Sequence, residues 1–235
     1  MIGDVWAKFP TVVDYRELAK IAEESPVRCA SLEAEQEMMD KITVCMQEGT
    51  RDTLGGIFEV VTLGCPPGLG SFVHWDRKLD SRLAQALMSI QAIKGVEVGL
   101  GFGVAQLPGS KVHDELYFGA GEGFTRGTNN AGGIEGGMTN GEPVVVRAAM
   151  KPISTLPTPL ATVDMKTRQP VKAHFERSDV CAVPAAAVIG EAMVALTLTQ
   201  AILEKFGGDS LEEFQRNYHS YMEVVRERGF TRTIA

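Results

Sequence analysis

The residues best suited to chemistry follow an apolar run near the middle of the chain. The run EPVVVRAAM leads directly into Lys151-Pro152-Ile153-Ser154-Thr155. A lysine ammonium and two hydroxyls can hold a phosphate, or the polar edge of a ring, through charge-assisted hydrogen bonds. The same residues are also typical of a solvated strand end. Both interpretations stay open from the residues alone.

A second charged group, Arg177-Ser178-Asp179, lies a few residues before a long apolar segment. If that segment is a helix, the group stands near its N-terminus, where anions are favoured. One interpretation places Arg177 and Asp179 at the mouth of a site. The alternative is a surface salt bridge, which would contribute little to stability.

Glycine dominates the segment from Gly119 to Gly141, where it occupies nine of 23 positions. Glycine reaches positive φ and allows a ligand to approach the backbone closely. Composition alone also fits a flexible linker. The polar residues within the segment favour a binding surface over a passive spacer; they are Thr128, Asn129, Asn130, Thr139 and Asn140.

Standard catalytic and nucleotide-binding motifs are absent from the sequence. Gly99, Gly101 and Gly103 resemble the start of a dinucleotide fingerprint, but Val104 occupies the position after Gly103 and the third glycine is missing. The four cysteines show neither a C-x-x-C pair nor zinc spacing, so we expect no metal site. Free thiols are typical of a reducing compartment, and we expect a cytoplasmic protein.

The composition is that of an ordinary globular protein. The 235 residues are 44% hydrophobic and 23% charged, with a net charge of −7. A protein that binds nucleic acid usually has a stripe of basic residues, and this sequence shows none. No uninterrupted apolar run reaches the roughly 18 residues typical of a membrane span. The glycine-rich segment is the one candidate linker, and we assign residues 1–235 to a single domain.

Helices and strands that would position these groups can be predicted from periodicity and capping. Helices are expected at 14–24 with Asp14 as N-cap, at 31–48 between Ser31 and Gly49, and at 79–92. Strands are expected within 53–63, over 96–107 with glycine interruptions, and over 143–150. An extended excursion with a turn at 164–169 follows. The helix predicted at 184–206 is apolar almost all round, which is typical of a buried or interface helix. A capping box at Ser210 and Glu213 starts the last helix.

Several of these segments together resemble chorismate synthase. The run NNAGGIEGGMTNGEPVVVRAAMKPIST at 129–155 is similar to the late signature region of that family, as is RSDVCAVPAAAVIGEAMVA at 177–195. PPGLGS at 66–71 and ALMSIQAIKGVEVG at 86–99 match in the same order. The resemblance covers the chain from about residue 27 to its end.

The resemblance implies an α+β fold in which helices lie between antiparallel sheets, a β-α-β sandwich. It implies conversion of 5-enolpyruvylshikimate 3-phosphate to chorismate and phosphate by a 1,4-anti elimination. Members of the family need reduced FMN without net redox change, are associated with NADP, and form homotetramers in the cytoplasm. Nucleic acid and membrane are not expected as partners.

Site residues follow from the resemblance position by position. The flavin contacts would be Gln91, Ala92, Gly136, the run Lys151, Pro152, Ile153, Ser154 and Thr155, and Arg177. Asp179 matches a carboxylate near flavin N5 that is a candidate proton relay.

The chain also departs from the family pattern. Family members are longer and begin with a segment that carries a Gly-Glu-Ser-His-Gly motif and a second catalytic histidine, and none of the four histidines here matches either one. We therefore expect the C-terminal portion of the fold, incomplete at the N-terminus, with little or no turnover by itself. The alternative is a non-catalytic flavin-binding or assembly module completed by a partner chain.

Overall fold

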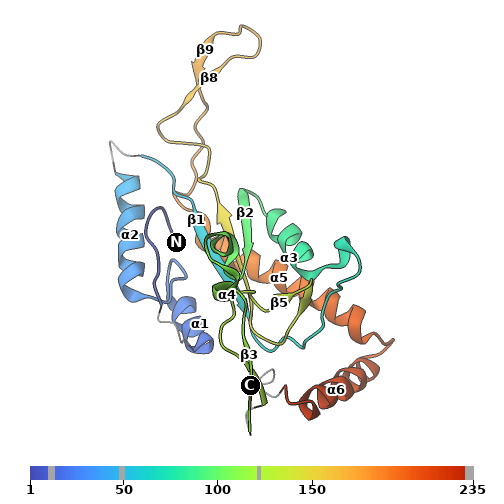
Figure 1. The fold of residues 1–235 in the computed structure, drawn as a ribbon. Coiled ribbons are helices and arrows are strands. Elements are labelled where there is room, and N and C mark those ends of the chain that lie inside the picture. Colours follow the sequence, from blue (N-terminus) through green and yellow to red (C-terminus); the bar gives the residue numbers. More distant parts are fainter. Residues whose placement is uncertain (10–13, 48–50, 121–122, 231–235) are drawn as a thin grey trace. The chain divides into compact units, whose positions relative to one another are not determined.

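The computed structural model describes residues 1–9, 14–47, 51–120 and 123–230. They form two compact units, each assembled from three parts of the chain. The first unit comprises Met1–Phe58, Gln91–Gly95 and Ala149–Ile189, and the second comprises Glu59–Ile90, Val96–Ala148 and Gly190–Ala235. Both mix helices with short antiparallel strands (Figure 1).

Two capped helices open the first unit as predicted. Helix α1 (Tyr15–Glu24) begins after Asp14, whose carboxylate accepts from the backbone N–H of Arg16 at 2.9 Å. Helix α2 (Leu32–Met46) begins after Ser31, whose hydroxyl oxygen accepts from the backbone N–H of Ala34. The predicted stop at Gly49 lies outside the described residues.

A three-stranded sheet has the order β1-β7-β2. Its strands are β1 (Gly56–Thr62), β2 (Ile93–Val98) and β7 (Val144–Met150). In β7 the side chains of Val144, Val146 and Ala148 are buried, whereas the intervening residues are partly exposed. This period of two places one face of the strand in the core.

Helix α3 (Leu79–Met88) fills the core of the second unit with Leu79, Leu83 and Leu87, all fully buried. The helix is shorter than predicted. The chain leaves it at Ser89, and Ala92 adopts a φ of 67° in the left-handed region. Gln91 and Ala92 therefore belong to a turn that leads into β2.

The predicted strand over 96–107 is wrong beyond Val98. The chain forms instead a 3-10 helix, η2 (Gly101–Gln106). Gly99 and Gly101 both have a φ of 59°, a backbone conformation that a strand does not use. The Glu97 carboxylate fixes the turn by accepting from the backbone N–H of Phe102 at 3.0 Å.

Two antiparallel hairpins include strands of the glycine-rich segment, so it is not a plain linker. Strand β3 (Leu116–Gly119) pairs with β4 (Gly123–Arg126), and β5 (Ile134–Glu135) pairs with β6 (Met138–Thr139). Residues 121–122 of this segment lie outside the described residues. Two further short elements belong to the second unit: η1 (Trp75–Arg77) and α4 (Gly109–Val112).

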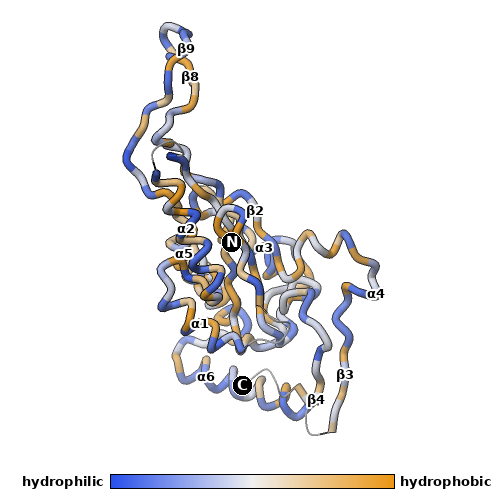
Figure 2. The backbone as a smooth tube through the Cα atoms, turned by 90° about the vertical axis from the view of Figure 1, so that its left-hand side faces the viewer, coloured by the Kyte–Doolittle hydropathy of each residue, from blue (hydrophilic) through white to orange (hydrophobic). Residues whose placement is uncertain are grey.

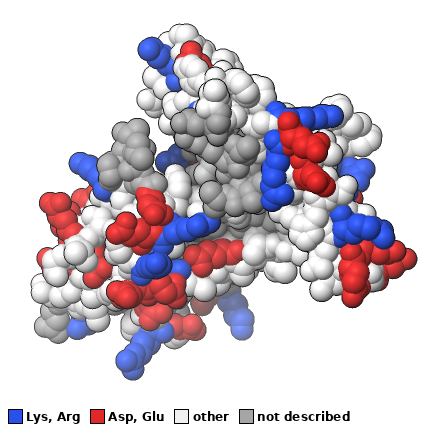
Figure 3. All heavy atoms as spheres, turned by 90° about the horizontal axis from the view of Figure 1, so that it is seen from below, with Lys and Arg blue, Asp and Glu red and all other residues white. Residues whose placement is uncertain are grey.

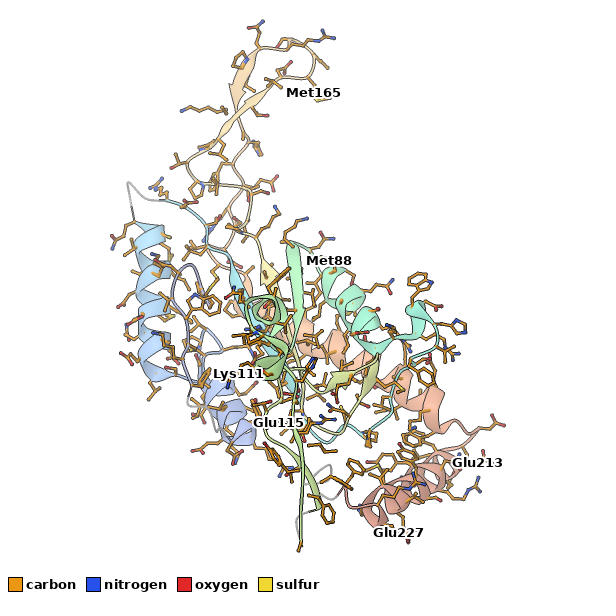
Figure 4. The ribbon with its side chains drawn as sticks, in the orientation of Figure 1. Met88, Lys111, Glu115, Met165, Glu213 and Glu227 are labelled. Carbon is orange, nitrogen blue, oxygen red and sulfur yellow. The ribbon has the colours of Figure 1, made fainter. Side chains whose placement is uncertain are left out.

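The predicted excursion is a two-stranded ribbon of β8 (Ala161–Val163) and β9 (Pro170–Lys172), which lie side by side in Figure 1. Every residue of both strands is exposed, including the apolar Val163 and Val171, and Figure 2 colours this part of the chain with both hydrophobic and hydrophilic residues. The Asp164 carboxylate shapes the predicted turn by accepting from the backbone N–H groups of Lys166 and Thr167. Met165, labelled in Figure 4, is 92% exposed near the turn.

Helix α5 (Val183–Phe206) matches its predicted bounds within one residue. By length and composition alone, it is the single described helix that could cross a membrane, with 33% of its most apolar window buried. The same composition suits the core helix of a globular protein, so this is weak evidence for a membrane span. Leu196 and Leu203 on this helix are 60% and 54% exposed.

Helix α6 (Leu211–Glu227) begins as predicted. The Ser210 hydroxyl accepts from the backbone N–H of Glu213, and the Glu213 carboxylate accepts from the backbone N–H of Asp209, one residue before the expected partner. On the face shown in Figure 3, acidic and basic side chains are interspersed.

Candidate functional site

The run Lys151–Thr155 leaves the end of β7 in the first unit and lies beside the turn that precedes β2. The backbone N–H of Lys151 donates to the carbonyl oxygen of Ala92 at 2.9 Å. The left-handed backbone of Ala92 is unfavourable for a residue with a Cβ. Strained positions of this kind cluster at ligand sites.

Thr53 fixes the middle of the same run. Its hydroxyl donates to the carbonyl oxygen of Ile153 at 2.6 Å, and the residue is only 6% exposed. The next residue, Leu54, donates its backbone N–H to the carbonyl oxygen of Val180 at 2.8 Å. The segment containing Thr53 therefore joins the 151–155 run to the segment that carries Asp179.

A hydrogen bond between two hydroxyls also joins the 151–155 run to the Arg177-Ser178-Asp179 segment. The Thr155 hydroxyl donates to the Ser178 hydroxyl oxygen at 3.3 Å, and Ser178 lies between Arg177 and Asp179. Nine of the ten predicted site residues thus belong to three connected segments of the first unit: Gln91, Ala92, Lys151, Pro152, Ile153, Ser154, Thr155, Arg177 and Asp179.

The charged members of this set are available to a ligand. Lys151, Arg177 and Asp179 are all exposed. Within the described ranges, none of these three side chains forms an ion pair. The salt-bridge alternative for Arg177 and Asp179 is therefore not supported, and two cations with free donors remain for an anion.

Gly136 belongs to the second unit. It forms, with Gly137, the two-residue turn of the β5–β6 hairpin, with φ values of 60° and 85°. Such turns need positive φ at both positions, which glycine adopts without strain. A Cβ on Gly136 would meet nothing within 4 Å, whereas one on Gly137 would collide with the Lys78 side chain. The space over Gly136 is open.

Thr139 holds this hairpin in place. Its hydroxyl donates to the carbonyl oxygen of Pro66 at 2.6 Å and accepts from the backbone N–H of Leu69 at 2.8 Å. The Leu79 N–H donates to the Gly137 carbonyl oxygen at 2.9 Å. Because Thr139 is buried, these bonds are shielded from water and fix the turn that presents Gly136.

Each of the two units, taken separately, carries groups that suit one part of a flavin mononucleotide. Its flat ring system needs backbone without side chains, which the open and exposed Gly136 provides. Its phosphate and ring edges need cations and hydroxyls, which Lys151, Ser154, Thr155 and Arg177 provide. In the part of the chain that the structure describes, no group of three or more His, Cys, Asp or Glu side chains could hold a metal ion.

Sequence reasoning did not identify Thr53, Gly55 or Ser178 as parts of this site. Thr53 and Ile153 are 100 positions apart, so no local pattern reveals their hydrogen bond. A Cβ on Gly55 would lie 2.9 Å from Pro152 Cδ, which explains the glycine only after folding.

Comparison with known proteins shows the family of this chain. A sequence model described as chorismate synthase matches residues 2–203. The chain belongs to the chorismate synthase family. Its relatives include the chorismate synthase of Desulforamulus reducens, 54% identical over 96% of this chain, and that of Geobacter sulfurreducens, 61% identical over 83%.

A solved structure supports the same family and the expected fold. A crystal structure of chorismate synthase is 42% identical, has a TM-score of 0.76, and covers 97% of this chain. The mixed helical and antiparallel architecture predicted from the resemblance is thereby confirmed. This chain spans 58% and 51% of the two bacterial relatives and 62% of the crystallised chain.

Proposed function

We propose that the protein to which this chain belongs converts 5-enolpyruvylshikimate 3-phosphate to chorismate and inorganic phosphate, in the shikimate pathway of aromatic amino-acid biosynthesis. The observation that carries the proposal is the connected set formed by 91–92, 151–155 and 177–179 in a chain of the chorismate synthase family. Because the chain spans little more than half of its curated relatives, the activity is proposed for the whole protein.

The proposed reaction is a 1,4-anti elimination without net redox change. The C–O bond to phosphate and the C6–H bond break, and a new carbon–carbon double bond forms. Reduced FMN, when bound, supplies electron density as phosphate leaves and regains it as the hydrogen is removed. Gln91, Ala92 and Gly136 are the backbone contacts proposed for the ring.

The charged residues have distinct proposed roles. Lys151 and Arg177 stabilise the negative charge that develops on the departing phosphate. Ser154 and Thr155 donate hydrogen bonds to flavin or phosphate oxygens, and Pro152 and Ile153 hold the run that places them. Asp179 accepts and passes on the proton released at C6. The exposure of all three charged side chains supports these roles.

An anaerobic assay tests the proposal. The protein is mixed with 5-enolpyruvylshikimate 3-phosphate and chemically reduced FMN, and chorismate and phosphate are measured in parallel. We expect equal amounts of both products with reduced FMN and none with oxidised FMN. Phosphate release without chorismate would contradict the proposal. The 235-residue chain alone is predicted to turn over little or no substrate.

A second candidate is a flavin-binding or assembly module that acts with another chain. The exposed apolar side chains on α5 favour a partner surface: Val188, Ile189, Leu196 and Leu203. The same surface suits a homotetramer. Stoichiometric FMN binding without turnover, together with a second polypeptide that restores activity, would favour this candidate. Light scattering during gel filtration measures the oligomeric state.

We further propose that residues 1–235 fold as one domain. Strands β1, β2 and β7 and helix α5 each run across the boundary between the two units, which supports this view. A cytoplasmic location and an association with NADP stay predictions.

A further inference from the structure

Asp114 in the second unit is bonded to the start of the glycine-rich turn. It lies between Lys111 and Glu115, both labelled in Figure 4, in the connection from α4 to β3. One carboxylate oxygen accepts from the Thr128 hydroxyl and from the backbone N–H of Asn130 at 2.7 Å. The other accepts from the backbone N–H of Ala131 at 2.9 Å.

Two further hydrogen bonds to backbone carbonyl oxygens join the same two segments. The Asn130 side-chain amide donates to the carbonyl oxygen of Val112 at 3.0 Å. The Arg126 guanidinium donates to the carbonyl oxygen of Asp114, also at 3.0 Å. Residues 112–114 and 126–131 are therefore interlocked by both side-chain and backbone groups.

Asn129 extends this network to the β5–β6 hairpin. Its side-chain amide donates to the carbonyl oxygen of Pro143 at 2.8 Å, and its amide oxygen accepts from the backbone N–H of Gly133 at 2.8 Å. The Gly133 carbonyl oxygen in turn accepts from the backbone N–H of Asn140 at 3.0 Å. These bonds hold the two ends of the hairpin that carries Gly136.

The path between these anchors depends on glycine. Gly132 and Gly133 have φ values of 62° and 77°. Glycine permits this conformation but does not enforce it, because it has the largest choice of backbone states. An external constraint is needed to select one state, and the Asp114 carboxylate is placed to supply it.

We propose that Asp114 is a positioning residue, which fixes the root of the β5–β6 hairpin so that Gly136 is presented to the flavin in one orientation. The proposal rests on the proposed function of the site. It assigns Thr128, Asn129 and Asn130 to the architecture of the loop, because their side-chain groups are bonded within the protein. None of these side chains is needed as a ligand contact.

The test compares Asp114→Asn with Asp164→Asn. Asparagine keeps the shape of aspartate but places an NH2 donor against an N–H or O–H donor. Asp164 is a matched control, because its carboxylate also accepts two backbone N–H groups, in the exposed β8–β9 turn. All variants are made in the whole protein; amide hydrogen exchange is measured without ligand, and FMN affinity and the kinetic constants are measured separately.

For Asp114→Asn we expect amide exchange at Asn130, Ala131 and Gly133 to accelerate, and FMN to bind about tenfold more weakly, as the loss of one charge-assisted bond implies. With FMN at saturation, kcat should stay within about twofold of the wild-type value. Asp164→Asn should change neither FMN affinity nor exchange at 130–133. Thr128→Val, which removes one donor only, should have a smaller effect of the same kind.

Two results would overturn the proposal: unchanged exchange at 130–133 in Asp114→Asn, or faster exchange with unchanged FMN affinity. The second would reduce Asp114 to a local structural role. A wild-type protein that fails to bind FMN would refute the proposed function instead, while the exchange data would still decide whether Asp114 fixes the hairpin.

Discussion

The Lys151 N–H and the Ala92 carbonyl oxygen, separated by 2.9 Å, join two segments that lie far apart in the sequence. The carbonyl can reach this position because Ala92 adopts a left-handed backbone, with a φ of 67°. This conformation is strained for a residue with a Cβ. It also directs the Ala92 carbonyl toward the run that carries the proposed phosphate contacts. This bond motivates the first prediction.

Ala92→Val should lower the free energy of unfolding by about 1–3 kcal/mol, because a β-branched residue tolerates positive φ poorly, and should weaken FMN binding. The matched control is Arg168→Val, since Arg168 has a φ of 58° in the exposed β8–β9 turn. The control should show backbone strain with unchanged FMN affinity. Calorimetry and flavin fluorescence titration measure the two effects. Equal FMN affinity in both variants would contradict a role for Ala92 at the flavin.

Gly136→Ala should weaken FMN binding at least tenfold, by roughly the 1.4 kcal/mol that a tenfold change represents, because the new methyl group would occupy the space proposed for the ring. Gly64→Ala is the control: Gly64 has a φ of 73°, and a Cβ there also meets nothing within 4 Å. Both variants should lose about 1–2 kcal/mol of stability through backbone strain. If both bound FMN normally, the ring would not lie over Gly136.

In the whole protein, Asp179→Asn should lower kcat far more than it weakens FMN binding, since the amide keeps the shape of the side chain but cannot carry a proton. Removing general acid–base assistance typically costs about 10²–10⁴-fold in rate. Asp209→Asn, at another exposed aspartate, should leave kcat unchanged. A collapse of FMN binding in Asp179→Asn would identify Asp179 as a structural anchor instead.

Thr53→Val should destabilise the protein by about 1–3 kcal/mol, because the carbonyl oxygen of Ile153 loses its hydroxyl donor in a part-buried hydrogen bond. Thr53→Ser retains the hydroxyl and should recover most of this loss. The loosened 151–155 run should also raise the KM for the phosphorylated substrate in Thr53→Val. Denaturant unfolding and steady-state kinetics of the two variants provide the comparison, and indistinguishable variants would exclude the hydroxyl as the cause.

Burial raises the pKa of the Cys65 thiol from 9.0 to about 11. As the pH rises through 9, the unfolded chain loses this proton while the folded protein retains it. The stability contributed by the neutral thiol is therefore lost between about pH 9 and pH 11, by up to roughly 3 kcal/mol. The stability difference between wild type and Cys65→Ala should shrink over this interval in denaturant titrations. A difference that is independent of pH would refute the shift.

Local signals allowed several elements to be predicted from sequence. Asp14, Ser31 and Ser210 begin helices as expected, because an N-cap bonds to N–H groups within three residues of itself. The strand predicted beyond Val98 is wrong because a turn replaces it. The Glu97 side chain folds back over Gly101 and fixes that turn. Apolar content alone does not reveal that contact.

For the candidate site, the sequence indicated which residues belong to it but not how they are arranged. Its residues came from the family resemblance, whereas their arrangement rests on contacts between distant positions, such as Thr155 with Ser178. The Asp114 network had no sequence signal, because its partners lie 14 to 17 positions away, beyond the β3–β4 hairpin. Long-range bonds of this kind appear only once the chain is folded.

The β8–β9 ribbon contributes no buried residue from either of its strands, and its turn is closed by its own Asp164. Exposed loop tips whose residues make no core contacts tolerate insertions best. A fluorescent peptide grafted beside Met165 would therefore leave the hydrophobic interior intact, giving an optical reporter attached to the same unit as Lys151 and Asp179.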